Sequence, residues 1–116
     1  MHIPKCGGTS VLQTIRETHP QPSGLAAYTA VDKAESDKAT AHAVNAIAPG
    51  IIGEEAAKLG ALVIHHSTDY VFDGAKDGPY VETDPTNPLS VYGRTKLDGE
   101  QALVASGARH LIFRTS

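Results

Sequence analysis

The stretch GALVIHHSTD, residues 60–69, decides the fold because it marks a change from a helix to a buried strand. Gly60 is typical of a helix end, since glycine adopts the left-handed conformation without a steric penalty. The apolar run that follows, ALVIHHS at 61–67, predicts a strand covered on both faces, as in a parallel sheet. Thr68 and Asp69 come directly after it, and open α/β sheets bind ligands at the carboxyl ends of their strands. We therefore expect a functional site at this strand end.

The segment before the strand, residues 36–59, predicts a helix. It is rich in alanine, and its larger apolar residues recur at steps near three and four, which places them on one face. Pro49 and Gly50 interrupt this pattern. A proline inside a helix removes a backbone donor and clashes with the preceding turn, which costs about 3 kcal/mol. The segment is therefore predicted to form two short helices or one kinked helix.

A long loop, a second helix and a second strand follow the first strand. The loop, residues 67–90, contains two Asp-Gly pairs and three prolines. It is much longer than the usual roughly 2 to 6 residues, which is typical of loops that carry function. Ser90 is expected to cap a helix at 91–105, and HLIFR at 110–114 predicts another apolar strand. This alternation predicts the α/β class, with a partial, Rossmann-like, doubly wound parallel sheet.

Composition and charge exclude several classes of protein. With 116 residues the chain forms one domain at most, and its 41% hydrophobic composition supports a modest core. A net charge of -3 without a basic stripe argues against a nucleic-acid partner. No apolar run approaches the roughly 18 residues of a membrane span, and the first twenty residues do not resemble a signal peptide, so we expect a cytoplasmic protein without membrane association. Cys6 is the single cysteine, which excludes an internal disulfide and fits a reducing compartment.

A tyrosine and a lysine stand one helical turn apart in VYGRTKLDGE, residues 91–100. Side chains four residues apart project from the same face of a helix, so Tyr92 and Lys96 can act together on one substrate atom. The spacing alone is weak support. An exposed pair of this kind also occurs as a surface contact that stabilises a helix by a few tenths of a kcal/mol.

Thr68 completes a candidate proton-delivery site. If the loop folds back so that the second helix starts beside the strand end, the Thr68 hydroxyl, the Tyr92 phenol and the Lys96 ammonium converge on one carbonyl oxygen. The ammonium would favour the phenolate and ease proton transfer to a developing alkoxide, while the threonine holds the carbonyl. No side chain supplies a hydride, so a nicotinamide cofactor, NADPH or NADH, is required. The alternative is that Thr68 and Asp69 merely form a turn at the strand end.

Four phrases of the sequence resemble one enzyme family. They are YTAVDKAE (28–35), HHSTDYVFDG (65–74), PYVETDPTNPLSVYGRTKLDGE (79–100) and HLIFRTS (110–116). In this order they closely resemble the dTDP-4-dehydrorhamnose reductase family, sugar-nucleotide enzymes among the extended short-chain dehydrogenases/reductases. The resemblance covers about residues 26–116. It implies NAD(P)H-dependent reduction of the 4-keto group of dTDP-4-dehydro-L-rhamnose, the last step of dTDP-L-rhamnose synthesis.

The same resemblance implies a role for individual residues. Thr68, Tyr92 and Lys96 match the family's catalytic triad, and Lys96 also matches a contact to the nicotinamide ribose. Asp69 matches a contact to the dTDP-sugar substrate beside Thr68. The cofactor-binding residues implied are Ala26, Ala27, Thr29, His66, Tyr92 and Lys96.

Residues 1–24 depart from the pattern of this family. The expected first strand and its Gly-rich turn are absent, and MHIPKCGGTS at 1–10 is instead similar to the phosphosulfate-binding loop of sulfotransferases. We interpret residues 1–24 as an atypical N-terminal segment and residues 25–116 as a partial NAD(P)-binding reductase domain that is truncated at its C-terminus.

Two other functions are kept open. One is an inactive fragment that serves as a structural or interaction module, with a homo-oligomer that covers open sheet edges. The other is a binder of phosphosulfate nucleotides through residues 4–10.

Other titratable residues are expected to be structural. Asp32, Lys33 and Glu35 predict the solvated start of a helix, where Glu35 in the first turn suits the helix dipole. His65 and His66 lie in an apolar strand and are expected to be hydrogen-bonded rather than metal-bound. We therefore predict no metal site in this chain.

Overall fold

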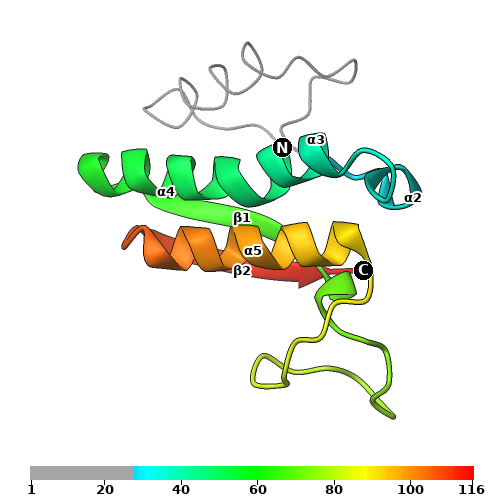
Figure 1. Cartoon of the computed structure of the whole chain (residues 1–116). Helices are drawn as coiled ribbons and strands as arrows, with labels where there is room; N and C mark the ends of the chain where they lie inside the picture. Colours follow the sequence, from blue (N-terminus) through cyan, green and yellow to red (C-terminus); the bar gives the residue numbers. More distant parts are fainter. Residues whose placement is uncertain (1–27) are drawn as a thin grey trace.

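The computed structural model describes residues 28–116, which form a layer of helices packed on a two-stranded sheet (Figure 1). The elements follow one another in the order α2 (Val31–Ala34), α3 (Lys38–His42), the π-helical turn η1 (Ala43–Ile47), α4 (Ala48–Leu59), β1 (Leu62–Thr68), the 3-10 turn η2 (Asp69–Val71), α5 (Val91–Ala105) and β2 (Arg109–Thr115). A long loop joins η2 to α5. The predicted order of helix, strand, loop, helix and strand is confirmed.

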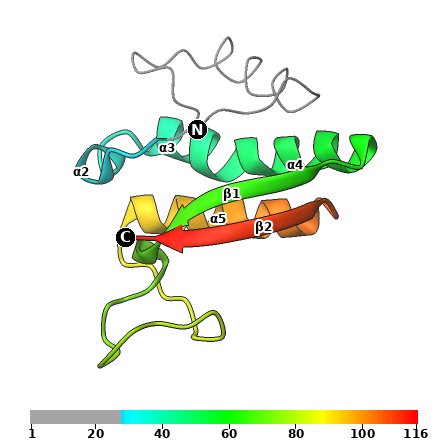
Figure 2. The same cartoon turned by 180° about the vertical axis from the view of Figure 1, so that it is seen from behind.

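β1 and β2 are parallel and pair in register from Leu62 opposite Arg109 to Thr68 opposite Thr115. The chain crosses from one strand to the other through α5, and α4 and α5 lie side by side on one face of the sheet (Figures 1 and 2). Parallel strands joined through a helix are the unit from which Rossmann-like sheets are built. The described chain has the predicted class, α/β with a partial, Rossmann-like parallel sheet.

The opposite face of this sheet is open within residues 28–116 (Figure 2). Leu62 and Ile64 of β1 are 48% and 47% exposed, and Leu111 and Phe113 of β2 are each 48% exposed. The apolar run of β1 predicts cover on both faces, and for the described residues this is wrong. The reason is that both long helices pack on the same side of the sheet.

Pro49 does not divide the helix before β1. α3, η1 and α4 follow one another without a break, and Pro49 is the second residue of α4, directly after the π-helical turn. A π turn widens the backbone locally and shifts its hydrogen bonds, which accommodates the missing donor and the ring of a proline. Gly99 of α5 packs here, since a Cβ on it would overlap the carbonyl oxygen of Asn45. Of the two predicted alternatives, two separate helices are wrong, and the structure has one continuous helical stretch with a π turn before Pro49.

The ends of the helices follow the predicted signals, with one exception. Gly60 ends α4 in the left-handed conformation, with φ 65°. Ser90 precedes α5, and its Oγ accepts a hydrogen bond from the Gly93 N–H at 3.0 Å. The exception is Glu35, which we expect in the first turn of a helix. It instead follows the last residue of α2, because that helix is a single turn that begins at Val31.

A small apolar cluster connects the first described residues with α5. Its buried members, and the two valines that pack against them, are Tyr28, Ala34, Ala41, Val44, Tyr92, Val31 and Val91. Tyr92 therefore has its ring in the core that residues 28–44 form.

No helix among residues 28–116 combines the length and the apolar character needed to cross a membrane. In the same range, no three His, Cys, Asp or Glu side chains are grouped so that they could hold a metal ion.

Candidate active site

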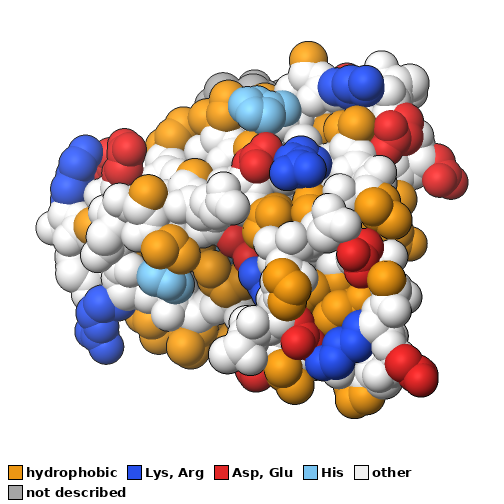
Figure 3. All heavy atoms as spheres, turned by 60° about the horizontal axis from the view of Figure 1, so that its bottom comes forward, with side chains coloured by type: hydrophobic (Ala, Val, Ile, Leu, Met, Phe, Trp, Pro, Cys, Tyr) orange, Lys and Arg blue, Asp and Glu red, His pale blue; other side chains and the backbone are white. Residues whose placement is uncertain are grey.

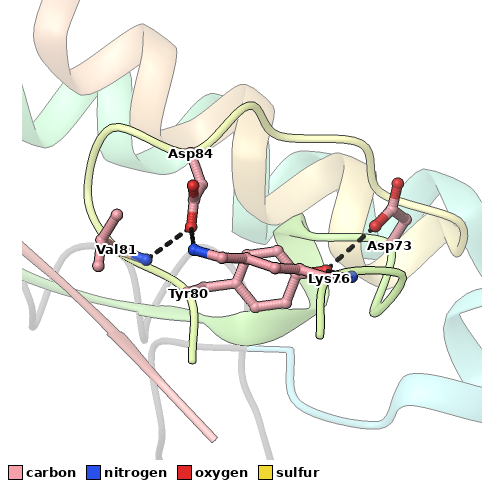
Figure 4. A network of polar contacts seen from close by, with 5 residues as sticks. All are labelled: Asp73, Lys76, Tyr80, Val81 and Asp84. Carbon is pink, nitrogen blue, oxygen red and sulfur yellow. Dashed lines mark hydrogen bonds and ion pairs between the residues drawn. The ribbon is translucent and has the colours of Figure 1, made fainter. Parts of the chain in front are cut away.

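The loop between η2 and α5 is held together by its own side chains (Figure 4). The rings of Phe72 and Tyr80 stack with their centroids 4.2 Å apart. Lys76 Nζ donates to Asp84 Oδ2 at 2.6 Å, and the same oxygen accepts the Val81 N–H at 2.8 Å. The hydrogen bond from Lys76 is the largest cause that holds the pKa of Asp84 below its ordinary value, followed by the bond from Val81.

Asp73 joins the two ends of this loop. Its carboxylate accepts a hydrogen bond from Asn87 Nδ2 at 3.0 Å. The Ala75 N–H and the Tyr80 hydroxyl donate to it at 2.9 and 3.1 Å. These bonds lower the pKa of Asp73, with the one from Asn87 as the largest cause. The Asn87 N–H also donates to the Val71 carbonyl at 2.9 Å, so the loop returns the chain to the end of β1.

Gly93, in the first turn of α5, lets η2 pack directly against the helix. A Cβ at this position would overlap the carbonyl oxygen of Tyr70 and would lie 3.2 Å from Pro88 Cβ. Only glycine permits such a close approach of two backbones. The carboxyl end of β1 consequently lies beside the N-terminus of α5, as the proton-delivery hypothesis requires.

Thr68 and Tyr92 meet at this junction, and both are buried. Burial raises the pKa of the Tyr92 phenol, and the Thr68 hydroxyl opposes this effect in part. The Tyr70 ring meets the Tyr92 ring edge-on, with the centroids 5.7 Å apart. Thr68 Oγ1 also accepts the Tyr70 N–H at 3.2 Å, so the turn proposed as an alternative is present as well. The phenol is protonated at neutral pH and has a hydroxyl beside it.

Lys96 lies one turn further along the same face of α5 and is 5% exposed. Its Nζ donates to the carbonyl oxygen of His66 in β1 at 2.7 Å. Burial lowers the pKa of Lys96, and the Glu100 carboxylate acts in the opposite direction. Burial of the phenol is the largest cause of the raised Tyr92 pKa, and the Lys96 ammonium donates to the His66 carbonyl, so an effect of Lys96 on Tyr92 stays a prediction.

The other predicted site residues differ in what the structure says of them. His66 and Asp69 are exposed and lie on either side of the Ser67–Thr68 strand end. Ala26 and Ala27 lie outside the described residues, and so does the segment 1–24 with its phosphosulfate-like motif.

Asn45 fixes the backbone next to Thr29, the remaining predicted cofactor residue, whose own side chain is exposed. Asn45 Oδ1 accepts the Tyr28 N–H at 3.2 Å, and its Nδ2 donates to the Tyr28 carbonyl at 3.0 Å. The same Nδ2 donates to Thr95 Oγ1 at 3.4 Å, which adds a contact to α5. Sequence reasoning missed this residue. The signal is that Asn45 is a polar residue among the apolar positions of its helix. Such a side chain is buried here, and a buried polar side chain needs hydrogen-bond partners.

Glu100 connects β1, α5 and β2 through a network that sequence reasoning also missed. Ser67 Oγ donates to Glu100 Oε1 at 2.5 Å. Arg114 Nε and Nη2 donate to the two carboxylate oxygens at 3.0 and 2.6 Å. Glu100 is only 4% exposed, so its charge depends on these partners. The signal is the spacing, since Glu100 follows Lys96 by four residues and belongs to the same face of α5.

His65 of β1 lies near the charges of Lys96 and Glu100. Its pKa is lowered to about 4, first by burial and then by the Lys96 ammonium. Among the described residues, its Nε2 is buried without a hydrogen-bond partner. The expectation that His65 is a hydrogen-bonded structural residue is therefore wrong for this nitrogen, because the strand carries the ring into a region occupied by apolar groups and Lys96.

Two grooves lie around the junction. One of about 400 Å³ is lined by Tyr70, Leu89 and Ser90 at the start of α5, with Asp69 beside them. A larger one, of about 920 Å³, runs along α5 and β2, and Asp69 lines it too. Figure 3 shows hydrophobic side chains around charged ones on this side of the molecule. Asp69 lines both grooves, whereas Thr68, Tyr92 and Lys96 line neither of them.

Comparisons with known proteins place the chain in one family. A family model described as RmlD substrate binding domain matches residues 8–116. The dTDP-4-dehydrorhamnose reductases of Sinorhizobium fredii and Escherichia coli are 54% and 52% identical to the chain over 109 and 116 residues. These matches cover 93% and 96% of this chain but 37% and 39% of the two relatives.

Solved structures show the same relation. A dTDP-4-dehydrorhamnose reductase from Clostridium acetobutylicum superimposes with a TM-score of 0.77 at 37% identity. The enzyme of that name from Bacillus anthracis, in complex with NADP, has a TM-score of 0.77 at 30% identity. Each match covers 95% of this chain and 40% of the other. The chain thus spans about two fifths of the length of the relatives it matches.

Proposed function

Because the chain belongs to the RmlD substrate binding domain family, we propose that it provides the proton-delivering part of an NAD(P)H-dependent sugar-nucleotide reductase. The substrate is a dTDP-4-dehydro sugar, dTDP-4-dehydro-L-rhamnose, whose 4-keto group becomes a hydroxyl. The relatives named dTDP-4-dehydrorhamnose reductase support this choice of substrate and of reaction. The function is carried out in the cytoplasm.

The observation that carries the proposal is the pairing of a hydroxyl and a phenol at one strand end. Thr68 ends β1 and Tyr92 lies in the first turn of α5, 24 positions later, yet both are buried at the junction where Gly93 lets η2 pack against α5. Lys96 is tied to the same strand end through the His66 carbonyl. Three donors of different acidity around one point are suited to a developing alkoxide.

Each residue has a part in the proposed reaction. The Thr68 hydroxyl donates to the keto oxygen and orients it. The phenol, whose ordinary pKa of 10.0 is raised further by burial, keeps its proton at neutral pH until the oxygen of the substrate becomes basic enough to take it. Lys96 then stabilises the phenolate by its positive charge. Asp69, exposed at the start of η2, contacts the sugar beside Thr68.

The residues present fit the nicotinamide end of a cofactor. The Lys96 ammonium has three N–H donors, and its bond to the His66 carbonyl uses one of them, which leaves donors for a ribose hydroxyl. When bound, the cofactor would supply the hydride that no side chain provides. The residues proposed to hold it are Ala26, Ala27, Thr29, His66, Tyr92 and Lys96.

The test is a turnover measurement with Tyr92→Phe as the variant. NADPH consumption is followed by its absorbance in the presence of the dTDP-4-dehydro sugar. We expect turnover by the unchanged chain and a loss of about hundredfold or more in kcat for Tyr92→Phe, since the proton donor is removed while the ring is kept. Thr68→Val tests the second donor in the same assay.

Two results would contradict the proposal in different ways. Unchanged turnover by Tyr92→Phe excludes the phenol as the proton donor. If the unchanged chain neither turns over nor binds NADPH in calorimetry, the chain by itself is not the reductase.

The open face of the sheet favours a second candidate, a module that works by association with a copy of itself. Four half-exposed apolar side chains on β1 and β2 are the supporting observation. This candidate requires the molar mass in light scattering to rise with concentration. A constant monomer mass excludes it.

A further inference from the structure

An acidic side chain from the segment before α3 reaches the first turn of α5. Glu35 Oε1 accepts a hydrogen bond from the Val91 N–H at 2.7 Å, although the two residues are 56 positions apart. Val91 is the first residue of α5, so its N–H is one of the amides that a helix cannot bond internally. A carboxylate at this end also interacts favourably with the helix dipole.

The segment that carries Glu35 is itself held in place. Asn45 bonds both the N–H and the carbonyl of Tyr28, at the beginning of the segment. Ala34, directly before Glu35, has no exposed surface and belongs to the apolar cluster that contains Tyr92. Glu35 and its hydrogen bond to Val91 are exposed, but the backbone that carries Glu35 is held by the buried residue before it.

The hydrogen bond between Glu35 and Val91 lies next to Tyr92, the proposed proton donor. Val91 precedes Tyr92, and Gly93 follows it. The Val91 N–H is bound by Glu35 and the Gly93 N–H by Ser90 Oγ, at 2.7 and 3.0 Å. Amides on both sides of Tyr92 thus have side-chain acceptors. Ser90 is a local cap, predicted from the sequence, whereas Glu35 joins α5 to the segment beside Thr29.

We propose that Glu35 is a positioning residue: by anchoring the first turn of α5 it holds the Tyr92 phenol toward Thr68. The catalytic meaning of this anchor rests on the proposed function. The anchor also connects the segment that begins beside the proposed cofactor residues with the helix that carries the proton donor.

Three substitutions at position 35 separate the effect of side-chain length from the effect of charge. Glu35→Ala removes the acceptor. Glu35→Asp keeps the charge but shortens the side chain by one methylene. Glu35→Gln keeps the length and an oxygen acceptor without the charge. Asp32→Ala is the matched control, because Asp32 is an exposed carboxylate of the same segment.

The first measurement is amide hydrogen exchange by NMR on the full chain. We expect exchange of the Val91 amide to be about tenfold or more faster in Glu35→Ala and Glu35→Asp, because a hydrogen bond to a charged acceptor is lost. Glu35→Gln and Asp32→Ala should exchange as the unchanged chain does, to within about threefold. Amides around Leu103, at the far end of α5, serve as the internal reference for folding.

The second measurement is the titration of the Tyr92 ring carbon in the NMR spectrum. Burial raises the pKa of this phenol, and loss of the anchor exposes it, so the titration should move toward that of an exposed tyrosine in Glu35→Ala and Glu35→Asp. Glu35→Gln should keep the original titration. A purely structural role of Glu35 would change folding without this local shift.

Unchanged Val91 exchange and an unchanged Tyr92 titration in a folded Glu35→Asp chain would overturn the proposal, even if Glu35→Ala does not fold. Neither measurement needs cofactor or substrate, so this failure would leave the reductase proposal untouched. Conversely, if the exchange and titration results are as expected but the unchanged chain shows no turnover, only the reductase proposal is contradicted. With turnover, Glu35→Ala should lower kcat by about tenfold and leave KM nearly unchanged, because positioning of the donor acts on the chemical step.

Discussion

The loop after η2 and the junction between β1 and α5 are both rich in polar contacts, but the charged groups at the centre of the junction are much more deeply buried. In the loop, the side chains of Lys76 and Asp84 are 37% and 19% exposed. At the junction, Lys96 and Glu100 are almost fully buried, and Glu100 is bonded by Ser67 and by Arg114. The same types of hydrogen bond and ion pair therefore act in two different environments.

The difference determines how much each region depends on a single bond. Water competes for exposed ion pairs, so each contributes only about 0–1 kcal/mol. A buried charge that loses its partner is left uncompensated, and the change lowers stability by about 3–5 kcal/mol. The loop is thus stable through the number of its bonds, whereas the junction, which holds the proposed chemistry, depends on individual residues.

Glu100→Ala should give the largest effect and is the strongest test of this contrast. It leaves the Arg114 guanidinium and the Ser67 hydroxyl without their shared acceptor. We expect the free energy of unfolding in urea to fall by about 3 kcal/mol, at the lower end of the range because Arg114 is partly exposed. Glu54→Ala, at an exposed position of α4, is the matched control. A loss below about 1 kcal/mol would remove the distinction between the two regions.

Acid should reveal the second effect, through His65. The pKa of His65 is about 4 in the folded chain, against an ordinary 6.5. Between these values the unfolded chain binds a proton that the folded chain does not, so the free energy of unfolding falls as the pH falls from 6.5 to 4 and is fully restored above 6.5. We expect a loss of about 2–3 kcal/mol over this window, allowing for the partial exposure of the ring.

Urea unfolding across the same pH range measures this contribution. His65→Phe should flatten the dependence, because it removes the titrating nitrogen and keeps a ring of similar size. His42→Gln, at an exposed position of α3, is the control. An equally steep dependence in His65→Phe would assign the acid sensitivity to other groups.

Lys76→Ala should have the smallest effect and completes the comparison on the loop side. It removes the ion pair with Asp84. The Asp84 carboxylate still accepts the hydrogen bond from the Val81 N–H. We expect little or no change in the free energy of unfolding, as for Lys58→Ala, which removes the exposed pair with Glu55 on α4. A loss of about 2 kcal/mol or more would mean that the loop, too, depends on single contacts.

Much of the fold follows from local signals, and the exceptions have identifiable causes. Gly60 and Ser90 act where their residue types predict, because a left-handed end and a hydroxyl cap involve only neighbouring backbone. The π turn before Pro49 is different, since Gly99 packs against it from another helix. The sequence predicts that Glu35 interacts with the first turn of its own helix. Its carboxylate instead accepts a hydrogen bond from the first residue of α5, and no local pattern indicates a contact across 56 positions.

The candidate site divides in the same way. Tyr92 and Lys96 share a face because four residues make about one helical turn, and the position of Thr68 at a strand end follows from the apolar run before it. The roles of Asn45, Glu100 and His65 do not follow from spacing. Each depends on which buried group another element brings beside it.

By itself, then, the sequence determined the elements, their order, their caps and the residues that share a helical face, because these depend on hydrogen bonds and side-chain periods within a few residues. The tertiary fold determines which face of the sheet is covered, which buried charges are paired, and that the pKa of Tyr92 is raised. The physical reason is that burial and the strength of electrostatic interactions depend on the approach of segments that lie tens of residues apart.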